Sequence, residues 1–471
     1  MEGTVEAPVS SRPAVRAAGL AARRPVVEPG RDVERVTAAV AVAALGVQKS
    51  VVDGVSVGVV VAVLLAPVWI RAFRSYRGGT VVVGLVALAL ANGALLTALR
   101  GSRLVFRPEA VGGASLLVQV GAGVGVLLWA RTVLGNAAVA IWLGVGLTAW
   151  GVVNLDPGTN LWKYAVGMPL SVLLLGIAAY VDRTWVSVVA LVALGGASLA
   201  FDARAFFAAL VLCGVVYLWA NLPGFSRSRN GWAGVVLMLV AVAGALYLLL
   251  SQLLVSGLLG SAAAERSQAQ ITESGSLILG GRPEIAATGA LLEHRPVGFG
   301  FGVAPTQADV NAAKAGMAAI NYDPNNGYVE NYMFGGRIEL HSVVGDLWAT
   351  SGFAGLLVTA AIVGYSLFAV GRGVATRTGT AVVFFAAVWT LWNVPFSPLV
   401  GAVPVLVLLV GLTLDPVRAG DDDGRADPPG AATRPNPPTL GSLPPDENAP
   451  GDLPVSASSP GRSPGPVREE Q

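Results

Sequence analysis

The sequence predicts an all-α, polytopic membrane protein with about twelve transmembrane helices, one large outer loop and disordered tails. Hydrophobic residues make up 54% of the 471 residues and charged residues only 13%, whereas soluble chains carry about a quarter charged residues. The mean hydropathy is +0.64. Apolar runs of membrane-spanning length, roughly 17–25 residues, recur along most of the chain.

The two ends of the chain differ from this apolar middle. Residues 1–35 contain arginines and prolines and lack the apolar stretch of a signal peptide, so we expect a disordered cytoplasmic segment followed by an uncleaved first membrane helix. From 415 onward the chain is dense in Pro, Gly, Asp and Ser, and it cannot bury enough apolar surface to fold. Residues 415–471 are therefore predicted to be a disordered cytoplasmic tail, and residues 36–414 to be the transmembrane domain.

Within this domain the apolar runs predict individual spans and the loop charges predict their orientation. The expected spans are 36–47, 55–70, 80–98, 110–130, 136–153, 164–181, 184–200, 205–221, 231–256, 343–370, 379–393 and 398–414. With the N-terminus inside, the arginine-rich loops 71–77, 226–229 and 371–377 are cytoplasmic, in agreement with the positive-inside rule. The expected outer loop 99–109 also carries three arginines. Either a span is miscounted there, or these arginines face an external anion.

The segment 257–341 is the one long polar stretch between expected spans, and the orientation places it outside the membrane. Loops of this length are usually functional or disordered. We expect a helix over about 282–294, a turn at the glycine cluster "GFGFG" (298–302) and a weaker helix over 306–320. The aromatic, turn-rich stretch that follows indicates a folded lid.

Motifs of soluble enzymes are missing from the sequence. It contains no P-loop, no HExxH, no paired CxxC and no GxSxG. We therefore predict no metal, no cofactor and no nucleic-acid partner. The single cysteine, Cys213, lies within an apolar run and is expected to act as a small hydrophobic residue.

Three polar residues are expected at the outer face of the membrane: Arg204, Arg282 and His341. Each also has a purely structural interpretation. Arg204 can extend from a helix end and pair with Asp202, Arg282 can be solvated beside Glu284, and His341 can cap the helix that follows it.

Together the three residues have a chemical logic that none has alone. Guanidinium groups bind diphosphate oxygens through paired, charge-assisted hydrogen bonds. A histidine is mostly neutral at pH 7 and can take a proton from a sugar hydroxyl. Glycosyl transfer from a lipid diphosphate requires this combination: the arginines hold the leaving diphosphate, and the base activates the acceptor hydroxyl.

The stretch from about 184 to 365 resembles the O-antigen ligase and O-antigen polymerase superfamily of bacterial envelopes. The similar features are an arginine before an apolar span ("DARAFFAALVL"), an arginine opening an outer loop that runs to a Gly-x-Gly turn ("GRPEIAATGALLEHRPVGFGFG"), and a histidine leading into a span ("LHSVVGDLWATSGFAGLL"). The chain departs from the family pattern at Ser342, where asparagine is frequent, and at Ala203, where serine is frequent.

The resemblance implies roles for these residues. His341 would be catalytic, and Arg204 and Arg282 would bind the diphosphate of an undecaprenyl-diphosphate-linked glycan without a metal. Arg337 and Glu339 are possible secondary residues that orient the base or the donor. Aromatic residues of the loop, Tyr322, Tyr328, Tyr332 and Phe334, would stack on sugars or form a membrane-interface belt, and His294 is expected to be structural.

The sequence therefore predicts a multi-pass glycosyltransferase of the bacterial cytoplasmic membrane, with its active site on the extracytoplasmic side. It would transfer or polymerise polyprenyl-diphosphate-linked glycans onto a glycan or lipid acceptor, with membrane lipids around it. The alternative is a flippase that transports lipid-linked oligosaccharides. Flippases need charged residues within their spans, and the expected spans contain almost none.

Overall fold

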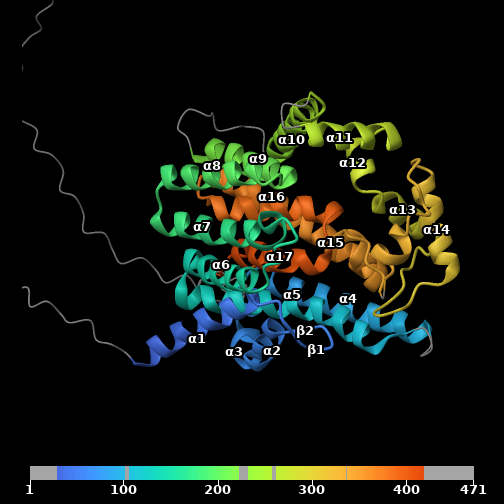
Figure 1. Cartoon of the computed structure of the whole chain (residues 1–471). Helices are drawn as coiled ribbons and strands as arrows, with labels where there is room; N and C mark the ends of the chain where they lie inside the picture. The colour runs from blue at the N-terminus through green and yellow to red at the C-terminus, as the bar shows by residue number, and fades with distance from the viewer. Residues whose placement is uncertain (1–28, 101–104, 222–231, 257–260, 336, 418–471) are drawn as a thin grey trace, which may run out of the picture. The chain divides into compact units, whose positions relative to one another are not determined.

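The computed structural model describes residues 29–100, 105–221, 232–256, 261–335 and 337–417, and most of them are helical (Figure 1). The helices are α1 (Pro29–Gly46), α2 (Val57–Leu64), α3 (Ala66–Trp69), η1 (Ile70–Ser75), α4 (Gly79–Arg100), α5 (Arg107–Leu134), α6 (Asn136–Val153), η3 (Trp162–Val166), α7 (Gly167–Val181), α8 (Thr184–Ala200), α9 (Arg204–Asn221), α10 (Trp232–Val255), α11 (Ser261–Ser274), α12 (Leu277–Gly281), α13 (Glu284–His294), α14 (Gln307–Ala318), η4 (Tyr328–Met333), α15 (Val343–Thr376), α16 (Ala381–Phe396) and α17 (Leu399–Thr413). Two short antiparallel strands, β1 (Ser50–Val52) and β2 (Val55–Ser56), form a hairpin before α2.

In the described part of the chain, seven helices are long and apolar enough to cross a membrane, or eight if one bent pair counts as a single span. They are α4, α5, α6, the continuous stretch of η3 and α7, α9, α10 and α15. An all-α, multi-pass membrane protein is thus supported, whereas the expected count of twelve spans is not confirmed. Three further apolar helices, α8, α16 and α17, have only 17, 16 and 15 residues.

The two expected tails begin and end differently from the prediction. Helix α1 starts at Pro29, so the last residues of the segment 1–35 are helical, and its charged first turns keep it outside the set of membrane-length apolar helices. At the other end, the amide of Val417 donates to Ser75 O and that of Arg77 donates to Asp415 O. The described chain therefore continues to Val417, past the predicted start of the tail at residue 415. Residues 1–28 and 418–471 of the tails expected over 1–35 and 415–471 lie outside the described residues.

The span expected over 55–70 is a bent pair of helices. Helices α2 and α3–η1 meet at 63°. Pro67 at the start of α3 has no amide hydrogen to continue the α2 ladder. The indole Nε1 of Trp69 donates to Ala62 O at 2.6 Å and satisfies a carbonyl that the break releases. The apolar composition of this run predicted its burial in lipid, but the proline decides its geometry.

Helix α15 is broken at Gly352, which adopts φ 56° and ψ −139°. A Cβ atom at this position would lie 2.4 Å from Val297 O, so only glycine fits. The break releases carbonyl groups that other segments satisfy. Asn92 Nδ2 donates to Ser351 O at 2.7 Å, and the amide of Phe299 donates to Ala349 O at 2.7 Å. The kink is thus the place where the "GFGFG" turn docks onto α15.

The expected outer segment forms a helical lid, which we define as residues 261–341 within the described chain. The helix expected over 282–294 is confirmed as α13, and the one expected over 306–320 is confirmed as the shorter α14. The lid has its own apolar core, which includes Leu291, Phe299, Met317, Val329 and Met333. This core packs against Trp348 of α15. The lid is therefore a folded unit that packs on the membrane-length helices.

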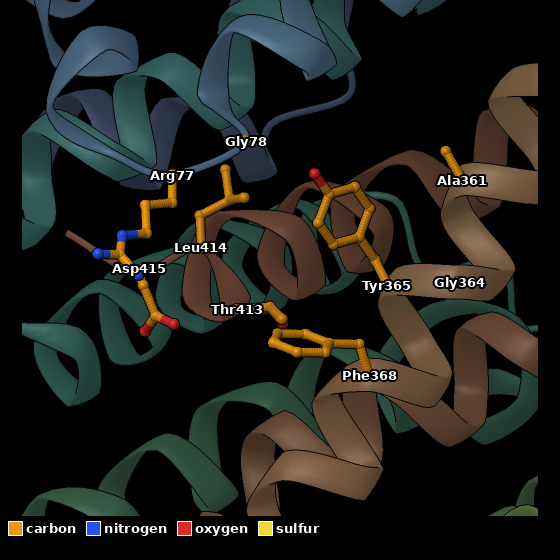
Figure 2. Close-up of a pocket in the computed structure, with 9 residues that line it drawn as sticks. All are labelled: Arg77, Gly78, Ala361, Gly364, Tyr365, Phe368, Thr413, Leu414 and Asp415. Atoms are coloured by element: carbon orange, nitrogen blue, oxygen red, sulfur yellow. The ribbon is translucent and has the colours of Figure 1, made fainter. Parts of the chain in front are cut away.

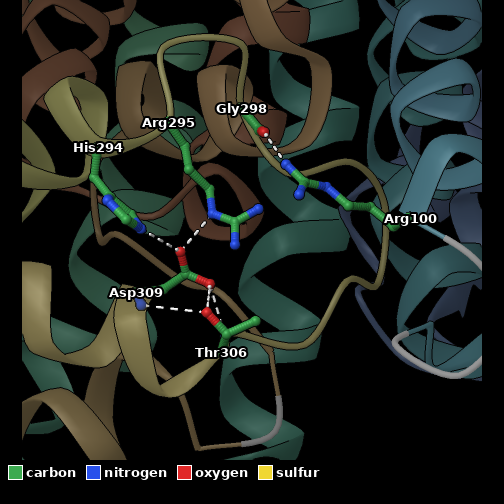
Figure 3. A network of polar contacts seen from close by, with 6 residues as sticks. All are labelled: Arg100, His294, Arg295, Gly298, Thr306 and Asp309. Carbon is green, nitrogen blue, oxygen red and sulfur yellow. Dashed lines mark hydrogen bonds and ion pairs between the residues drawn. The ribbon is translucent and has the colours of Figure 1, made fainter.

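The carboxylate of Asp309 ties the α13 end of the lid to the start of α14 (Figure 3). Its Oδ1 accepts from Arg295 Nε at 2.5 Å and lies 3.2 Å from His294 Nε2, while its Oδ2 accepts from the amide of Thr306 at 2.7 Å. Burial by itself would raise the pKa of Asp309, but the hydrogen bonds from Thr306 and Arg295 outweigh it and lower that pKa. This contact agrees with the structural role expected for His294.

One arginine of the expected outer loop 99–109 also contacts the lid. Arg100, the last residue of α4, donates from Nη2 to Gly298 O at 3.4 Å (Figure 3). Arg107 begins α5 and is exposed, while Arg103 lies outside the described residues. Arg100 therefore has a structural contact with the lid.

Candidate functional site

The three residues singled out in the sequence lie at the ends of three different elements. Arg204 is the first residue of α9 and follows a tight turn in which Asp202 has φ 50°. Arg282 follows α12 directly, and His341 precedes the N-cap residue of α15, Ser342. Helix ends are where a polar side chain leaves an apolar span without entering the bilayer core.

The structure brings Arg204, Arg282 and His341 together on the wall of one pocket of about 1380 Å³. The wall is formed by segments that are distant along the chain, from α6 to α17. Among its lining residues the charged ones are Lys163, Arg204 and Arg282 against a single carboxylate, Asp202. The lining of the pocket therefore has an excess of positive charge, which suits an anionic ligand.

Arg204 contacts both its own turn and the lid. Its Nε donates to Asp202 Oδ1 at 2.8 Å, and its Nη1 donates to Ser267 Oγ of α11 at 3.4 Å. The side chain is still 26% exposed, so part of the guanidinium faces the pocket. A guanidinium has five N–H donors, and the two contacts leave donors for a ligand.

Arg282 is held by a buried carboxylate. Its Nη1 lies 3.3 Å from Glu284 Oε1, and the Glu284 side chain is only 1% exposed. The other oxygen, Glu284 Oε2, accepts from the hydroxyl of Tyr328 at 3.0 Å. Burial, reinforced by the charge of Glu284, raises the pKa of Tyr328, so its hydroxyl stays protonated and acts as the donor. Glu284 thus fixes an arginine and a tyrosine of the pocket at once.

The imidazole of His341 is held from two directions. The ring of Tyr332 stacks on it with centroids 3.9 Å apart and an interplanar angle of 13°. Its Nδ1 lies 3.1 Å from the backbone oxygen of Glu339. Because a carbonyl oxygen only accepts, this contact selects the tautomer with the hydrogen on Nδ1 and the lone pair on Nε2.

The backbone of His341 is fixed as well. The residue adopts φ 53°, in the left-handed region that few non-glycine residues occupy. The residues on both sides of it are anchored: the amide of Leu340 donates to the buried Asp346 at 2.8 Å, and the Ser342 hydroxyl accepts from Gly345 N at 3.1 Å. These contacts impose the conformation and turn the imidazole toward the pocket, whose wall it lines.

Arg337 and Glu339, the possible secondary residues, do not line the pocket. Their side chains pair with each other at 2.6 Å, and Arg337 also lies 3.8 Å from Glu109 at the start of α5. Burial opposes charge on Arg337, but Glu339 outweighs it and raises the pKa of that guanidinium. The pair holds the segment before α15 to α5, and the backbone oxygen of Glu339 contacts His341.

Several pocket residues were not singled out from the sequence. Trp389, Trp392 and Asn393 of α16 line the pocket, as do Lys163 and Tyr164 of η3. The run "WTLWN" places two tryptophans at helical spacing beside an asparagine at the end of an apolar run, which was the available signal. Glu284 had no signal of its own, because its burial depends on the packing of α13 against η4.

Two further findings concern metal binding and the similarity of this chain to known proteins. No cluster of three or more His, Cys, Asp or Glu side chains suited to a metal ion occurs among the described residues. Comparisons with protein-family models, with curated protein sequences and with solved structures find no match for this chain.

Proposed function

We propose that this protein is a membrane glycosyltransferase that transfers a glycan from a polyprenyl-diphosphate donor to a hydroxyl of a glycan or lipid acceptor. Ligase-related and polymerase activities share this chemistry and differ in the acceptor. The single observation that carries the proposal is that Arg204, Arg282 and His341, distant along the chain, line one pocket. The multi-pass helical architecture agrees with a lipid-linked substrate.

The arginines bind the diphosphate in this proposal. Each already has one carboxylate neighbour, Asp202 for Arg204 and Glu284 for Arg282, which orients the guanidinium without using all of its donors. Lys163 adds a third positive charge to the same pocket. As the bond to the sugar breaks, the charge that develops on the departing diphosphate is stabilised by these fixed cations.

His341 is the general base. Its Nε2 takes the proton of the acceptor hydroxyl while that oxygen forms a bond to the anomeric carbon of the donor sugar. The bond between this carbon and the diphosphate oxygen breaks, and the polyprenyl diphosphate leaves with the electron pair. The Glu339 carbonyl and the Tyr332 ring keep the imidazole in the tautomer and orientation that this step needs.

Apolar residues offer a place for the polyprenyl chain. The pocket continues along one face of α10, where Leu239, Val240, Ala243 and Leu246 line it, and on to Leu367 of α15. Helix α10 is the least buried of the membrane-length helices, with 12% of its apolar window buried. A lipid chain can therefore lie between α10 and α15 while its diphosphate reaches the arginines. We place this reaction at the extracytoplasmic face of the bacterial cytoplasmic membrane.

The test is glycan transfer by the purified protein in lipid vesicles, with a polyprenyl-diphosphate-linked oligosaccharide as donor. We expect His341→Ala to lower the transfer rate by about 10²–10⁴-fold, the contribution typical of a general base, while donor binding is retained. His294→Gln is the matched control, since His294 is the other of the two histidines and is not among the pocket residues.

Two outcomes would contradict the proposal. Full transfer by His341→Ala would show that this histidine is not the base. Movement of the intact donor across the vesicle membrane, with no new glycosidic bond in the wild type, would favour the flippase alternative, because the same cationic and apolar pocket can hold a lipid-linked glycan without chemistry.

A further inference from the structure

A second pocket, of about 550 Å³, lies where α4 begins and α17 ends (Figure 2). It is formed by Arg77 and Gly78, by one face of α15, and by Thr413, Leu414 and Asp415. The α15 residues belong to the part of that helix after the Gly352 break, whereas His341 precedes its start. Its volume falls in the range of about 300–1,000 Å³ that is usual for ligand pockets. None of its lining residues lines the site proposed for glycosyl transfer.

One side of this pocket is cationic. Arg372 pairs with the carboxylate of Asp415, and the backbone of Asp415 accepts from the Arg77 amide at 2.8 Å. Arg131 donates from Nη1 to Leu414 O at 2.8 Å. Three arginines therefore contact residues 414–415. Arg77 lines the pocket and makes its contact through the backbone amide, whereas the guanidinium groups of Arg131 and Arg372 bind lining residues from beside the pocket. The carboxylate of Asp415 lies among these positive charges. The excess positive charge makes an anion the complementary ligand.

The other side is apolar. Ala361, Gly364 and Phe368 follow one another at helical spacing on one face of α15. No atom lies within 4 Å of the position of a Cβ on Gly364, and Phe368 is 51% exposed. Figure 2 shows the rings of Tyr365 and Phe368 on the α15 side of the pocket and Arg77 with Asp415 across from them. A flexible hydrocarbon chain fits such a groove, and its charged end would lie at the arginines.

We propose that this pocket binds one anionic phospholipid of the surrounding membrane. Its phosphate interacts with Arg77 and Arg372, and one acyl chain lies along Ala361, Gly364 and Phe368. A basic side chain near an anionic membrane surface contributes about 1 kcal/mol to binding. A bound lipid would link the loop before α4, the end of α17 and α15, three segments that meet at this pocket. The inference does not depend on the glycosyltransferase proposal.

The experiment uses the full chain in nanodiscs that contain equal amounts of phosphatidylglycerol and phosphatidylcholine with the same acyl chains. Native mass spectrometry then measures which lipid stays bound when the protein is released. We expect the wild type to retain phosphatidylglycerol preferentially. Arg77→Gln should lower that preference about fivefold, and Gly364→Leu should reduce retention of both lipids by filling the groove.

The matched controls are Arg183→Gln, an exposed arginine between α7 and α8, and Gly196→Leu on an exposed face of α8 with open space around it. Both should behave as the wild type. Asp415→Asn removes the carboxylate that opposes the three arginines and should increase retention of phosphatidylglycerol, a gain that misfolding cannot mimic.

Three results would overturn the inference. Equal retention of the two lipids by the wild type would exclude recognition of the charged headgroup. An unchanged lipid preference in both Arg77→Gln and Asp415→Asn would exclude the pocket as its origin. If inorganic phosphate, added to the protein in detergent, raises the unfolding temperature as much as phosphatidylglycerol does, the site binds free phosphate and not a membrane lipid.

Discussion

The ring of Tyr332 lies almost parallel to the imidazole of His341, with 3.9 Å between the two centroids. Tyr332 in turn contacts Tyr328 at a centroid distance of 4.8 Å, and the Tyr328 hydroxyl donates to Glu284. A chain of contacts thus runs from the carboxylate that holds Arg282 to the histidine that we propose as the base. Arg282 and His341 are therefore both positioned by contacts within the lid.

The stacking contact gives the first prediction. Tyr332→Ala should lower glycan transfer about two- to tenfold, because an aromatic pair contributes about 0.5–1.5 kcal/mol and the imidazole would lose one of its two supports. Tyr332→Phe keeps the ring and should retain nearly full activity. The measurement is kcat for transfer in vesicles. Equal loss in the two variants would mean that the hydroxyl, and not the stacking, is what matters.

The second prediction concerns Tyr328 and Glu284. Tyr328→Phe leaves one oxygen of the buried Glu284 carboxylate without this donor, so the protein should lose about 1–3 kcal/mol of stability. We also expect a higher KM for the donor, since Glu284 holds Arg282. Thermal unfolding and transfer kinetics measure the two effects. Tyr322→Phe, on the ring that packs beside Tyr328, is the control. An unchanged unfolding temperature in Tyr328→Phe would argue against this hydrogen bond.

The third prediction tests the packing of the lid against α4. Gly300 has φ 104°, and a Cβ there would lie 2.6 Å from the backbone nitrogen of Thr97. Gly300→Ala should therefore cost at least about 1–3 kcal/mol in strain and make the lid easier to cleave with a protease. Gly289→Ala, at an exposed position in α13 with open space around it, should instead add about 0.5–1 kcal/mol. A lid equally resistant to protease in the wild type and Gly300→Ala would contradict this packing.

The fourth prediction is a pH dependence of the lid. Because the folded state lowers the pKa of Asp309 below its ordinary value of 3.8, the charged carboxylate stabilises the fold above that pH. This stabilisation is lost as the pH falls through the lowered pKa. Protease resistance of the lid should therefore decrease below about pH 4.

Asp309→Asn separates this effect from general acid unfolding. The variant should have a weaker lid at neutral pH and a smaller further loss between pH 5 and pH 3 than the wild type. The other residues of the network, Arg295 and Thr306, stay in place in this comparison. A variant whose lid weakens with acid as steeply as that of the wild type would show that another group is responsible.

The helical periodicity and apolar composition were sufficient to predict most of the helices, because both are local properties of the chain. Helices α13 and α14 of the lid were also predicted from local signals, with the glycine cluster 298–302 marking the turn between them. The capping box of Thr306 at the start of α14 was seen only in the structure. Helices α8, α16 and α17 were predicted as spans over 184–200, 379–393 and 398–414, but they are shorter than the membrane-length helices. The bend between α2 and α3 was not predicted, because counts of apolar residues do not report where a helix breaks.

Some features of the site could not be predicted from the sequence, as Glu284, Tyr332 and Trp389 illustrate. Arg204, Arg282 and His341 were selected as polar residues at expected helix ends, and their common pocket follows from how the helices pack. The buried state of Glu284 and the stacking of Tyr332 on His341 are contacts between segments that local sequence does not relate. For Trp389 the only local signal was its helical spacing to Trp392 beside Asn393, and this spacing does not by itself say that the ring lines a pocket.

The sequence by itself determined the class of this protein, since burial of apolar side chains in lipid depends on composition and on the length of each run. It also determined which polar residues stand at helix ends. Only the tertiary structure decided that Arg204, Arg282 and His341 share a pocket, that Gly352 breaks α15, and that residues 414–415 contact three arginines beside an apolar groove. The reason is that these features are set by packing between distant segments, where a shift of a few ångströms in one helix separates or joins the side chains of another.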